Sequence, residues 1–228
     1  MFLFKIIRTP MFKLTLSILL LAVASFCYGQ VSLKGENSYP EGLYKTKEDF
    51  IKKVPSQQVD LVAKTLFWAK REVIDTIPDV CSFFYKDTDK KVKQMFAISY
   101  KGQLFIQAGS VLLNRDKKDK SQSTSAPYSF TRVLFGGENY LYLEMELANS
   151  WEQGLGYGLG GAAGSVIAQN AIKGKGIVWD FKANQFNIFR SCNDYNEFIA
   201  DKYAEGVQEC KGKQPDMLQV REAIDKIK

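Results

Sequence analysis

The sequence predicts a domain of the α+β class, in which an antiparallel, hairpin-built sheet of about six strands, curled or barrel-like, precedes a C-terminal pair of helices. Three observations predict it. From Cys81 onward apolar residues recur with a period of two, which is typical of strands buried on one face. Short polar or glycine-containing turns separate these strands, which favours hairpins over the long crossovers of a parallel sheet. From Asp194 the apolar spacing changes to three and four, which is typical of helices.

The first half of the chain is expected to hold two helices. Thr46 and Asp49 form a capping box at the start of the first helix, and Pro55 marks its end. Residues 59–74 fit two patterns, because their apolar side chains keep helical spacing while Leu66–Trp68 would also suit a strand. We interpret this stretch as a helix.

The middle of the chain is expected to form the sheet, in which CSFFY is followed by three hairpins. The first joins MFAISY to QLFIQA through Lys101-Gly102, the second joins YSFTRVLF to YLYLEMEL, and the third joins GIVWDF to QFNIFR. In the first hairpin the expected matching apolar faces are Phe96 and Ile98 against Leu104 and Ile106. In YLYLEMEL one face carries Leu141, Leu143, Met145 and Leu147, and the other carries Tyr140, Tyr142, Glu144 and Glu146.

Two helices are expected at the C-terminal end. Asp194 and Glu197 form a capping box for the first of them, and Gly206 supplies its stop. Pro215 opens the second, whose apolar stripe consists of Met217, Val220, Ile224 and Ile227. We expect this stripe to dock on the domain's own sheet, with a partner protein as the alternative.

Residues 1–29 resemble a cleavable signal peptide. A basic residue, Lys13, precedes the uncharged run LTLSILLLAVASF, which is shorter than the roughly 20 residues of a spanning helix. We expect cleavage after Gly29, with cleavage after Ala24 as the alternative, so that residues 30–228 form one exported domain. Either Met1 or Met11 is the start of translation.

The exported protein is not expected to be a lipoprotein, because the bulky Phe26 precedes Cys27 where a lipoprotein signal needs a small residue. We therefore expect to find it in the periplasm, in the outer envelope or in the medium.

The charge balance argues against a nucleic-acid partner. The whole chain has 31 Lys and Arg against 25 Asp and Glu, a formal charge of +6. Removal of residues 1–29 takes away three basic residues and no acidic one, which leaves 28 against 25, or +3. The one dense basic cluster, RDKKDK, is interrupted by Asp116 and Asp119, and we interpret residues 115–125 as a solvated polar loop.

The absence of His from all 228 residues excludes Ser-His-Asp and Cys-His catalysis and every His-containing zinc site. A carboxylate-based hydrolase would use Glu144 and Glu146, about 7 Å apart on one strand face, although a solvated outer face explains the pair better. Asp87–Asp89 is better explained as a polar turn than as a calcium loop. We therefore expect no metal and no cofactor, and the sequence favours a role other than catalysis.

After cleavage the chain keeps Cys81, Cys192 and Cys210. Cys192 and Cys210 lie on either side of one predicted helix, so a disulfide between them would close a short loop in an oxidising compartment. Cys81 would then be a buried free thiol. In the alternative, all three are reduced core residues.

The segment at residues 154–172, GLGYGLGGAAGSVIAQNAI, is rich in glycine and carries no charge. Three interpretations remain. Gly156, Gly158 and Gly161 satisfy the dinucleotide-binding pattern G-x-G-x-x-G, with Asp180 as the ribose ligand, but the preceding hairpins oppose it. The fourth-residue spacing of small side chains would form a zipper for membrane insertion or self-association, made of Gly156, Gly160, Gly164 and Ala168. We favour the third interpretation, close packing against the sheet.

One resemblance covers nearly the whole mature chain. The segments EGLYKTKEDFIKKVPS, FAISYKGQLFIQ, GGENYLYLEMELANSW and KGIVWDFKANQFNIFRSCNDYNEFI, with a glycine-rich insert, occur in this order. The sequence resembles an uncharacterised family of secreted or envelope proteins of Bacteroidota, a domain of unknown function. The resemblance implies a location in a Gram-negative envelope and implies no activity.

The sequence therefore predicts an exported envelope protein with a binding or structural role toward a protein, peptide or glycan of the envelope. Aromatic density suggests Tyr140, Tyr142 and Trp179 as a ligand face. The alternatives are a membrane-associating or self-assembling protein acting through residues 154–172, and the carboxylate-based hydrolase. The sequence indicates no oligomeric state.

Overall fold

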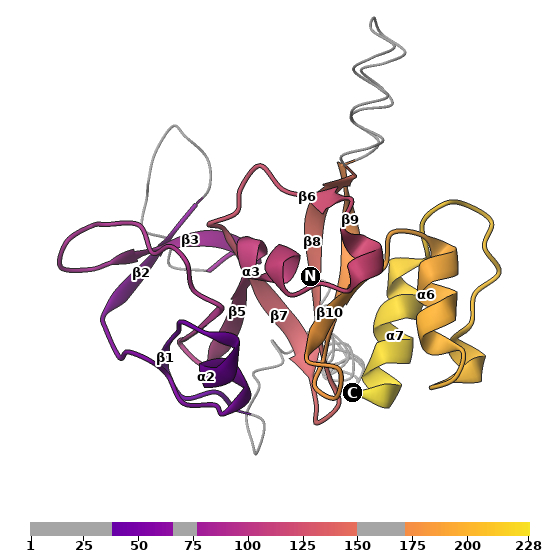
Figure 1. The fold of residues 1–228 in the computed structure, drawn as a ribbon, viewed down its shortest axis with the longest axis horizontal. Helices are drawn as coiled ribbons and strands as arrows, with labels where there is room; N and C mark the ends of the chain where they lie inside the picture. The colour runs from indigo at the N-terminus through magenta and orange to yellow at the C-terminus, as the bar shows by residue number, and fades with distance from the viewer. Residues whose placement is uncertain (1–37, 66–76, 150–171) are drawn as a thin grey trace, which may run out of the picture. The chain divides into compact units, whose positions relative to one another are not determined.

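Ten strands form one sheet in the part of the chain that the computed structural model describes, residues 38–65, 77–149 and 172–228 (Figure 1). All pairings between named strands are antiparallel, in the order β1-β4-β5-β7-β8-β9-β10, with β2 and β3 branching from β7 and β6 added to β8. The strands are β1 (Gly42–Tyr44), β2 (Leu61–Lys64), β3 (Val80–Tyr85), β4 (Ala97–Tyr100), β5 (Gln103–Gln107), β6 (Gln122–Ser123), β7 (Phe130–Gly136), β8 (Tyr140–Asn149), β9 (Ile172–Asp180) and β10 (Gln185–Ile188).

Helices are few and short in these residues. The α-helices are α2 (Lys47–Ile51), α3 (Ala108–Leu113), α6 (Cys192–Ile199) and α7 (Met217–Ile227), and the 3₁₀ turns are η1 (Lys117–Asp119) and η2 (Ala204–Gly206). The predicted α+β class, the antiparallel sheet and the C-terminal helical pair are confirmed. The predicted strand number is too low, because β1, β6 and other short strands carry too few residues to show a period.

The capping box of α2 forms as predicted. The Thr46 hydroxyl oxygen accepts a hydrogen bond from the Asp49 backbone N–H, and the Asp49 carboxylate accepts one from the Thr46 N–H, each at 3.1 Å. The helix ends at Ile51, before Pro55, and Lys53 follows with a positive φ of 54°.

The helix expected over residues 59–74 is wrong where the structure describes the chain. Residues 61–64 form β2, which pairs antiparallel with β3 in the register Leu61↔Tyr85 to Lys64↔Ser82. Leu61 and Ala63 alternate into a cluster of buried residues. The sequence of residues 61–64 is compatible with a helix or a strand, and pairing with β3 makes it a strand. Residues 66–76 lie outside the described part.

The three predicted hairpins are present, with one correction. Lys101 and Gly102 both have positive φ, 52° and 71°, as a two-residue type I′ turn requires. This turn pairs Ile98 with Phe105, so Ile98 faces the opposite side from Phe96, Leu104 and Ile106. Both faces of this hairpin are buried, so its sequence lacks the polar face that would have indicated the register.

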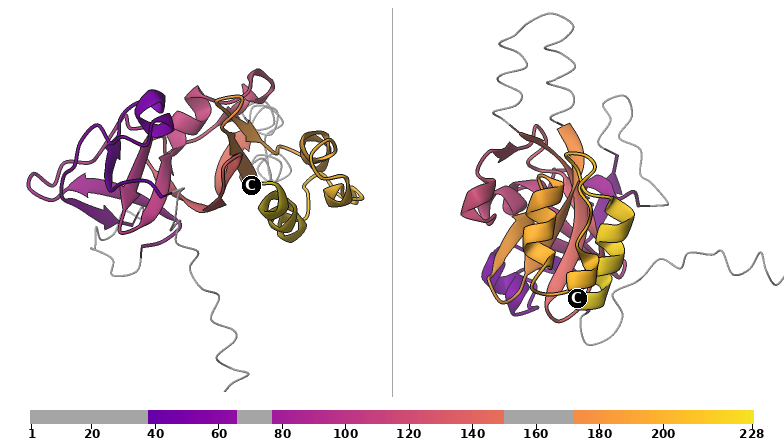
Figure 2. Two further views of the ribbon diagram at one scale, coloured as in Figure 1. Left: turned by 90° about the horizontal axis from the view of Figure 1, so that it is seen from below. Right: turned by 90° about the vertical axis from the view of Figure 1, so that its right-hand side faces the viewer.

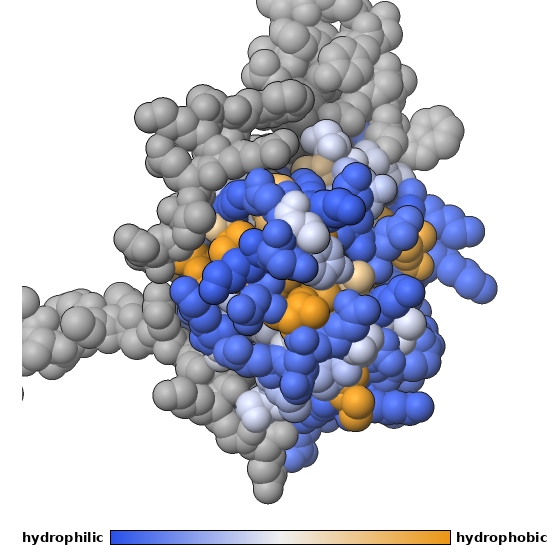
Figure 3. All heavy atoms as spheres, turned by 90° about the vertical axis from the view of Figure 1, so that its left-hand side faces the viewer, coloured by the Kyte–Doolittle hydropathy of each residue, from blue (hydrophilic) through white to orange (hydrophobic). Residues whose placement is uncertain are grey.

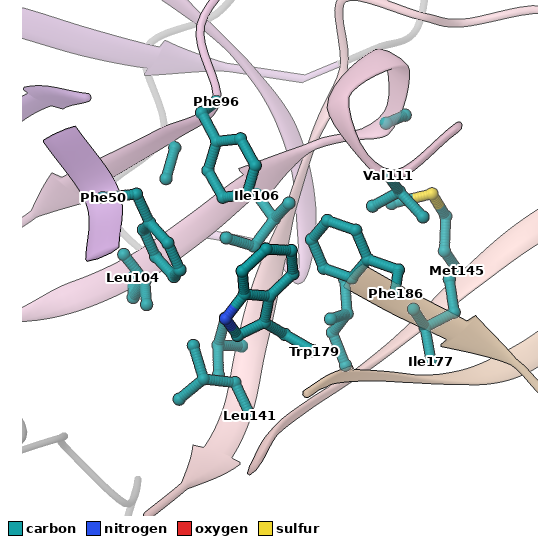
Figure 4. Close-up of a cluster of buried hydrophobic side chains, with 14 of the residues drawn as sticks. Phe50, Phe96, Leu104, Ile106, Val111, Leu141, Met145, Ile177, Trp179 and Phe186 are labelled. Atoms are coloured by element: carbon teal, nitrogen blue, oxygen red, sulfur yellow. The ribbon is translucent and has the colours of Figure 1, made fainter. Parts of the chain in front are cut away.

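The curled half-barrel encloses an aromatic core (Figure 4). Leu141, Leu143, Met145 and Leu147 of β8 point into this core, as their alternation predicted. Trp179 of β9 lies at its centre, with ring centroids 4.8 Å from Phe186, 5.4 Å from Phe96 and 5.8 Å from Phe50. The inner face of the sheet is therefore filled with side chains.

The outer faces of the sheet are covered as well. The β2–β3 hairpin packs over β4 and β5 through a second cluster around Phe83, Ile98, Phe105 and Phe130. On β8 and β9, α6 and α7 lie side by side over Tyr142 and Val178, on the face opposite the aromatic core (Figure 2). The apolar stripe of α7 thus docks on the domain's own sheet, as expected.

The first of these helices begins earlier than predicted. Ser191 caps α6 by accepting a hydrogen bond from the Asp194 N–H at 3.1 Å, so Asp194 occupies the third helical position. Gly206 does not end α6, which stops at Ile199. A Cβ at Gly206 would lie 2.9 Å from the Cβ of Ala223, so glycine is needed there for the close approach of α7.

The expected solvated loop at residues 115–125 contains η1 and β6, and much of it is held by side chains. The Arg115 guanidinium donates to three backbone carbonyls, those of Leu112, Asp119 and Lys120. The backbone of Asn114 and Asp116 hydrogen-bonds to Phe186 along the edge of β10. Asp119 has no exposed surface. The polar side chains of residues 115–125 thus serve internal hydrogen bonds as well as contact with solvent.

Candidate functional site

The aromatic ligand face suggested by Tyr140, Tyr142 and Trp179 is not formed. Tyr142 and Trp179 are fully buried and point to opposite faces of the sheet, Trp179 into the aromatic core and Tyr142 under α6 and α7. Tyr140 is half-buried and packs edge-on against Phe198, with centroids 5.6 Å apart. These aromatic side chains stabilise the fold.

Glu144 and Glu146 are not brought together in a cleft. The Glu144 carboxylate accepts hydrogen bonds from Nε and Nη2 of Arg221 at 2.6 and 2.7 Å and from the Tyr142 hydroxyl at 2.9 Å. Glu146 is exposed. Since Glu144 serves to hold α7 on the sheet, this is not the arrangement that the hydrolase hypothesis requires.

The dinucleotide-binding interpretation also lacks its structural context. β8 and β9 pair antiparallel, whereas the fingerprint needs a parallel strand–helix–strand unit. The Asp180 carboxylate accepts hydrogen bonds from the N–H groups of Lys182 and Ala183 at 2.8 Å, which makes it a turn residue. Gly156, Gly158 and Gly161 lie outside the described residues.

The proposed zipper residues Gly156, Gly160, Gly164 and Ala168 lie outside the described residues as well. Both ends of the segment that contains them are described. β8 and β9 remain paired up to Ala148↔Ile172, so the chain leaves and returns at one end of the longest ladder of the sheet. None of the helices in the described part of the chain has the length and apolar composition of a membrane-spanning segment.

No group of three or more metal-ligating side chains occurs in residues 38–65, 77–149 and 172–228. Asp87–Asp89 forms the turn after β3, in which Asp89 has a positive φ of 50° and pairs with Lys64. The described part of the chain therefore offers no evident cation site at this turn.

The best candidate for ligand contact is an open groove between β1, β4 and the start of β2. It has a volume of about 500 Å³, and we call it the β1–β2 groove. Its lining residues are Glu41, Gly42, Gln58, Val59, Asp60, Leu61, Lys86, Ser99 and Tyr100. On the face that carries β1 to β3, apolar residues form separate islands in a hydrophilic surface (Figure 3).

Backbone geometry shapes one wall of the groove. Gly42 has a φ of +143°, and a Cβ there would lie 2.5 Å from the Gln57 carbonyl oxygen. Residues 55–57 can therefore run directly against β1, where the Leu43 N–H donates to the Gln57 carbonyl at 2.8 Å. The next residues, Gln58 to Leu61, line the groove together with Tyr100.

The polar groups of the groove are mostly free to meet a ligand. Asp60 and Lys86 are 85% and 66% exposed at their side chains, and their closest N–O distance is 3.8 Å, a solvent-screened pair of little energetic weight. Glu41 accepts one hydrogen bond, from the Gly102 N–H at 3.2 Å. Sequence reasoning missed this groove because its residues come from four separated segments, none of which carries a motif.

The predicted disulfide is present, with the Cα atoms of Cys192 and Cys210 5.7 Å apart. Cys81 is a buried free thiol, and desolvation by burial raises its pKa to about 12, so it stays protonated at neutral pH. The interpretation in which all three cysteines are reduced is wrong.

A buried carboxylate links the 115–120 segment to α6. Asp119 accepts a hydrogen bond from the Ile188 N–H at 3.0 Å, and its second oxygen lies 3.1 Å from Nε of Arg190. Arg190 also pairs with Asp194 at 2.6 Å. Desolvation by burial raises the pKa of Asp119 to about 6, although the Ile188 N–H and Arg190 oppose that change. The arrangement is structural, because Asp119 has no exposed surface through which to reach a substrate.

Comparisons with protein-family models, curated proteins and solved structures find no match to this chain. The fold alone defines the class, an α+β domain built on a curled antiparallel half-barrel, in which a disulfide joins Cys192 to Cys210.

Proposed function

We propose that this chain is an exported envelope protein that binds another component of a Gram-negative envelope through the β1–β2 groove. The observation that carries the proposal is the groove itself, which combines carboxylates, a lysine, an amide and a partly exposed tyrosine on one open surface. The disulfide supports export, because disulfides persist in oxidising compartments.

The chemistry of the groove favours a polar polymer as the ligand. Its volume lies within the range of about 300–1,000 Å³ that is usual for ligand sites, but small-molecule sites are predominantly apolar. Here the charged and amide groups of Glu41, Gln58, Asp60 and Lys86 supply donors and acceptors, and Tyr100 supplies one aromatic side chain. Such a surface suits a peptide or a glycan chain, whose backbone groups or hydroxyls repeat along the groove.

Charge reversal in the groove tests the proposal. The mature protein carrying Glu41→Lys and Asp60→Lys is compared with the wild type for binding to isolated outer membranes and to purified peptidoglycan. Glu146→Lys with Glu222→Lys is the matched control, because both glutamates are also exposed, both lie outside the groove, and the change in net charge is the same. We expect the groove variant to lose about fivefold or more in affinity, since removing charge-assisted contacts costs on the order of 1 kcal/mol or more. If the groove variant binds as the control does, the proposal is wrong.

A second candidate function is membrane association or self-assembly through residues 154–172. The observation in its favour is the pairing of Ala148 with Ile172, which brings the two ends of the uncharged segment together, as in an insertion into a hairpin. The domain is then expected to fold without the insertion, since a short turn connects two paired strands equally well.

Replacing residues 150–171 by a glycine-containing turn separates this candidate from the packing interpretation. A variant that keeps the wild-type melting temperature and loses carbonate-resistant membrane association supports the second candidate. A variant that unfolds indicates that the segment packs on the sheet, as the sequence favoured. A wild-type protein that is removed from membranes by a salt wash contradicts the membrane role.

A further inference from the structure

The Cys192–Cys210 disulfide connects two segments that hydrogen bonds already hold together. The Asn196 side chain donates to the Gln208 carbonyl at 2.8 Å and accepts from the Gln208 N–H at 2.9 Å. The Cys192 N–H donates to the Lys213 carbonyl at 2.8 Å. These bonds lie on both sides of Cys210 in the chain, so the position of residues 208–213 does not depend on the disulfide alone.

The same loop is tied to the start of α7, and α6 is held by packing. The Gln208 side chain donates to the Asp216 carbonyl at 3.0 Å and accepts from the Asp216 N–H at 2.8 Å. α6 buries Tyr195, Phe198 and Ile199 against the sheet. Opening the disulfide would therefore remove one of several restraints and leave the packed core untouched.

The two sulfur-bearing residues differ in access. Cys192 is only 2% exposed, whereas Cys210 is exposed on the loop. An open hollow of about 520 Å³ lies beside the disulfide, and of the two cysteines it is Cys192 that lines it, together with residues 207–209, 211–212, 214–216 and Gln219. Cys210 therefore presents more surface to an incoming thiol than Cys192 does, and Cys192 borders solvent only through the hollow.

The surroundings of Cys192 favour it as the sulfur that leaves. Cys192 is the first residue of α6, where the helix dipole stabilises negative charge. The nearby carboxylate of Asp194 is neutralised by its 2.6 Å pair with Arg190. Lys211 at the rim of the hollow is paired with Glu209 at 3.4 Å, so the helix terminus is the local feature that favours a thiolate at Cys192.

We propose that Cys210 is a site of thiol–disulfide exchange with a low-molecular-weight thiol of the glutathione type. The thiolate of the small thiol attacks Sγ of Cys210, the Cys192–Cys210 bond breaks, and its electron pair leaves on Sγ of Cys192 as a thiolate. The products are a mixed disulfide on Cys210 and a free Cys192, and the reverse attack by Cys192 restores the disulfide and releases the small thiol. The domain stays folded throughout the cycle.

The test exposes the native mature protein to reduced glutathione, traps free thiols with N-ethylmaleimide and maps the products by peptide mass spectrometry. We expect the glutathione adduct on Cys210, the maleimide on Cys192, which unlike Cys81 lines an open hollow, and the aromatic bands of the near-ultraviolet circular dichroism unchanged. Cys81 is the internal control, because this buried thiol takes up maleimide only if the domain unfolds. An adduct on Cys192, no adduct without denaturant, or labelling of Cys81 in step with the exchange would overturn the proposal.

Single-cysteine variants test the difference between the two sulfurs without the exchange step. Cys192→Ser leaves an exposed thiol at residue 210, and Cys210→Ser leaves a buried thiol at residue 192. With oxidised glutathione, the first variant is expected to react about tenfold faster or more. In Asn196→Ala, which lacks the parallel restraint, reduction is expected to lower the melting temperature further than it does in the wild type. Equal rates for the two cysteine variants would contradict the assignment of Cys210 as the attacked sulfur.

Discussion

The carboxylate of Glu144 on β8 is held in a two-point contact by the guanidinium of Arg221 on α7, at 2.6 and 2.7 Å. The same carboxylate accepts the hydroxyl hydrogen of Tyr142, a residue with no exposed surface. One acidic side chain thus connects the last helix to the sheet and also satisfies a buried hydroxyl group.

Substitutions of Arg221 and of Glu144 are expected to lower the free energy of unfolding by different amounts. Arg221→Ala removes a partly exposed ion pair and should lower the free energy of unfolding by about 0.5–1 kcal/mol, because solvent screens the pair. Glu144→Ala also leaves the buried Tyr142 hydroxyl without its acceptor and should cost about 1–3 kcal/mol. Urea denaturation measures both, with Glu222→Ala as a neutral control on the same helix. A smaller effect of Glu144→Ala than of Arg221→Ala would contradict this account.

The buried Asp119 should make stability depend on pH. Its pKa is raised to about 6 in the folded protein, so between about pH 4 and 6 the folded state binds more protons than the unfolded state. Asp119 therefore opposes folding above pH 6, and this cost is relieved as the pH falls toward 4. The stability of the wild type relative to Asp119→Asn should rise by on the order of 1–3 kcal/mol over that range.

Paired denaturation curves from pH 7 to pH 4 measure this difference. Asn at residue 119 can still accept the hydrogen bond from Ile188, so the variant is expected to fold. The other carboxylates titrate alike in both proteins, so their contributions cancel in the difference between the two free energies of unfolding. A difference that is constant over the range, or that falls with decreasing pH, would show that Asp119 does not have a raised pKa.

Substitutions of Trp179 are expected to change the stability of the core and not the binding of a ligand. Trp179→Ala is expected to cost about 3–5 kcal/mol, as for other large-to-small changes in a packed interior. Trp179→Phe should cost clearly less, because the indole N–H has no hydrogen-bond partner among the described residues and its removal leaves no unpaired group behind. Thermal unfolding ranks the two variants. Equal losses would indicate that the indole N–H has a partner.

The β4–β5 turn offers a stabilising change. Lys101 adopts a φ of 52°, which costs energy for a side chain other than Asn, Asp or Gly. Lys101→Asn produces the preferred Asn-Gly pair of a type I′ turn and should raise the free energy of unfolding by about 0.5 kcal/mol. Lys93→Asn, at another exposed lysine, is the control for the change of charge. A destabilised Lys101→Asn protein would indicate that the contact of Lys101 with the Tyr100 ring, at 5.3 Å, outweighs the turn.

The features that the sequence alone determined are local ones. The capping box at Thr46, the hairpin turns, the alternation along β8 and the stripe of α7 depend on residues within about ten positions of each other, so their patterns could be recognised without the fold. The Cys192–Cys210 pairing spans 18 residues and was still predictable, since the two cysteines bracket a single short helix.

Tertiary structure decided the rest, because burial depends on what packs against a segment. Residues 61–64 form a strand because they pair with β3. Ile98 faces away from Leu104 because a second layer of side chains covers that face of the hairpin. The partners of Asp119 lie about seventy residues away. The β1–β2 groove exists only where four distant segments meet, and no single one of them carries the set of polar side chains that line it together.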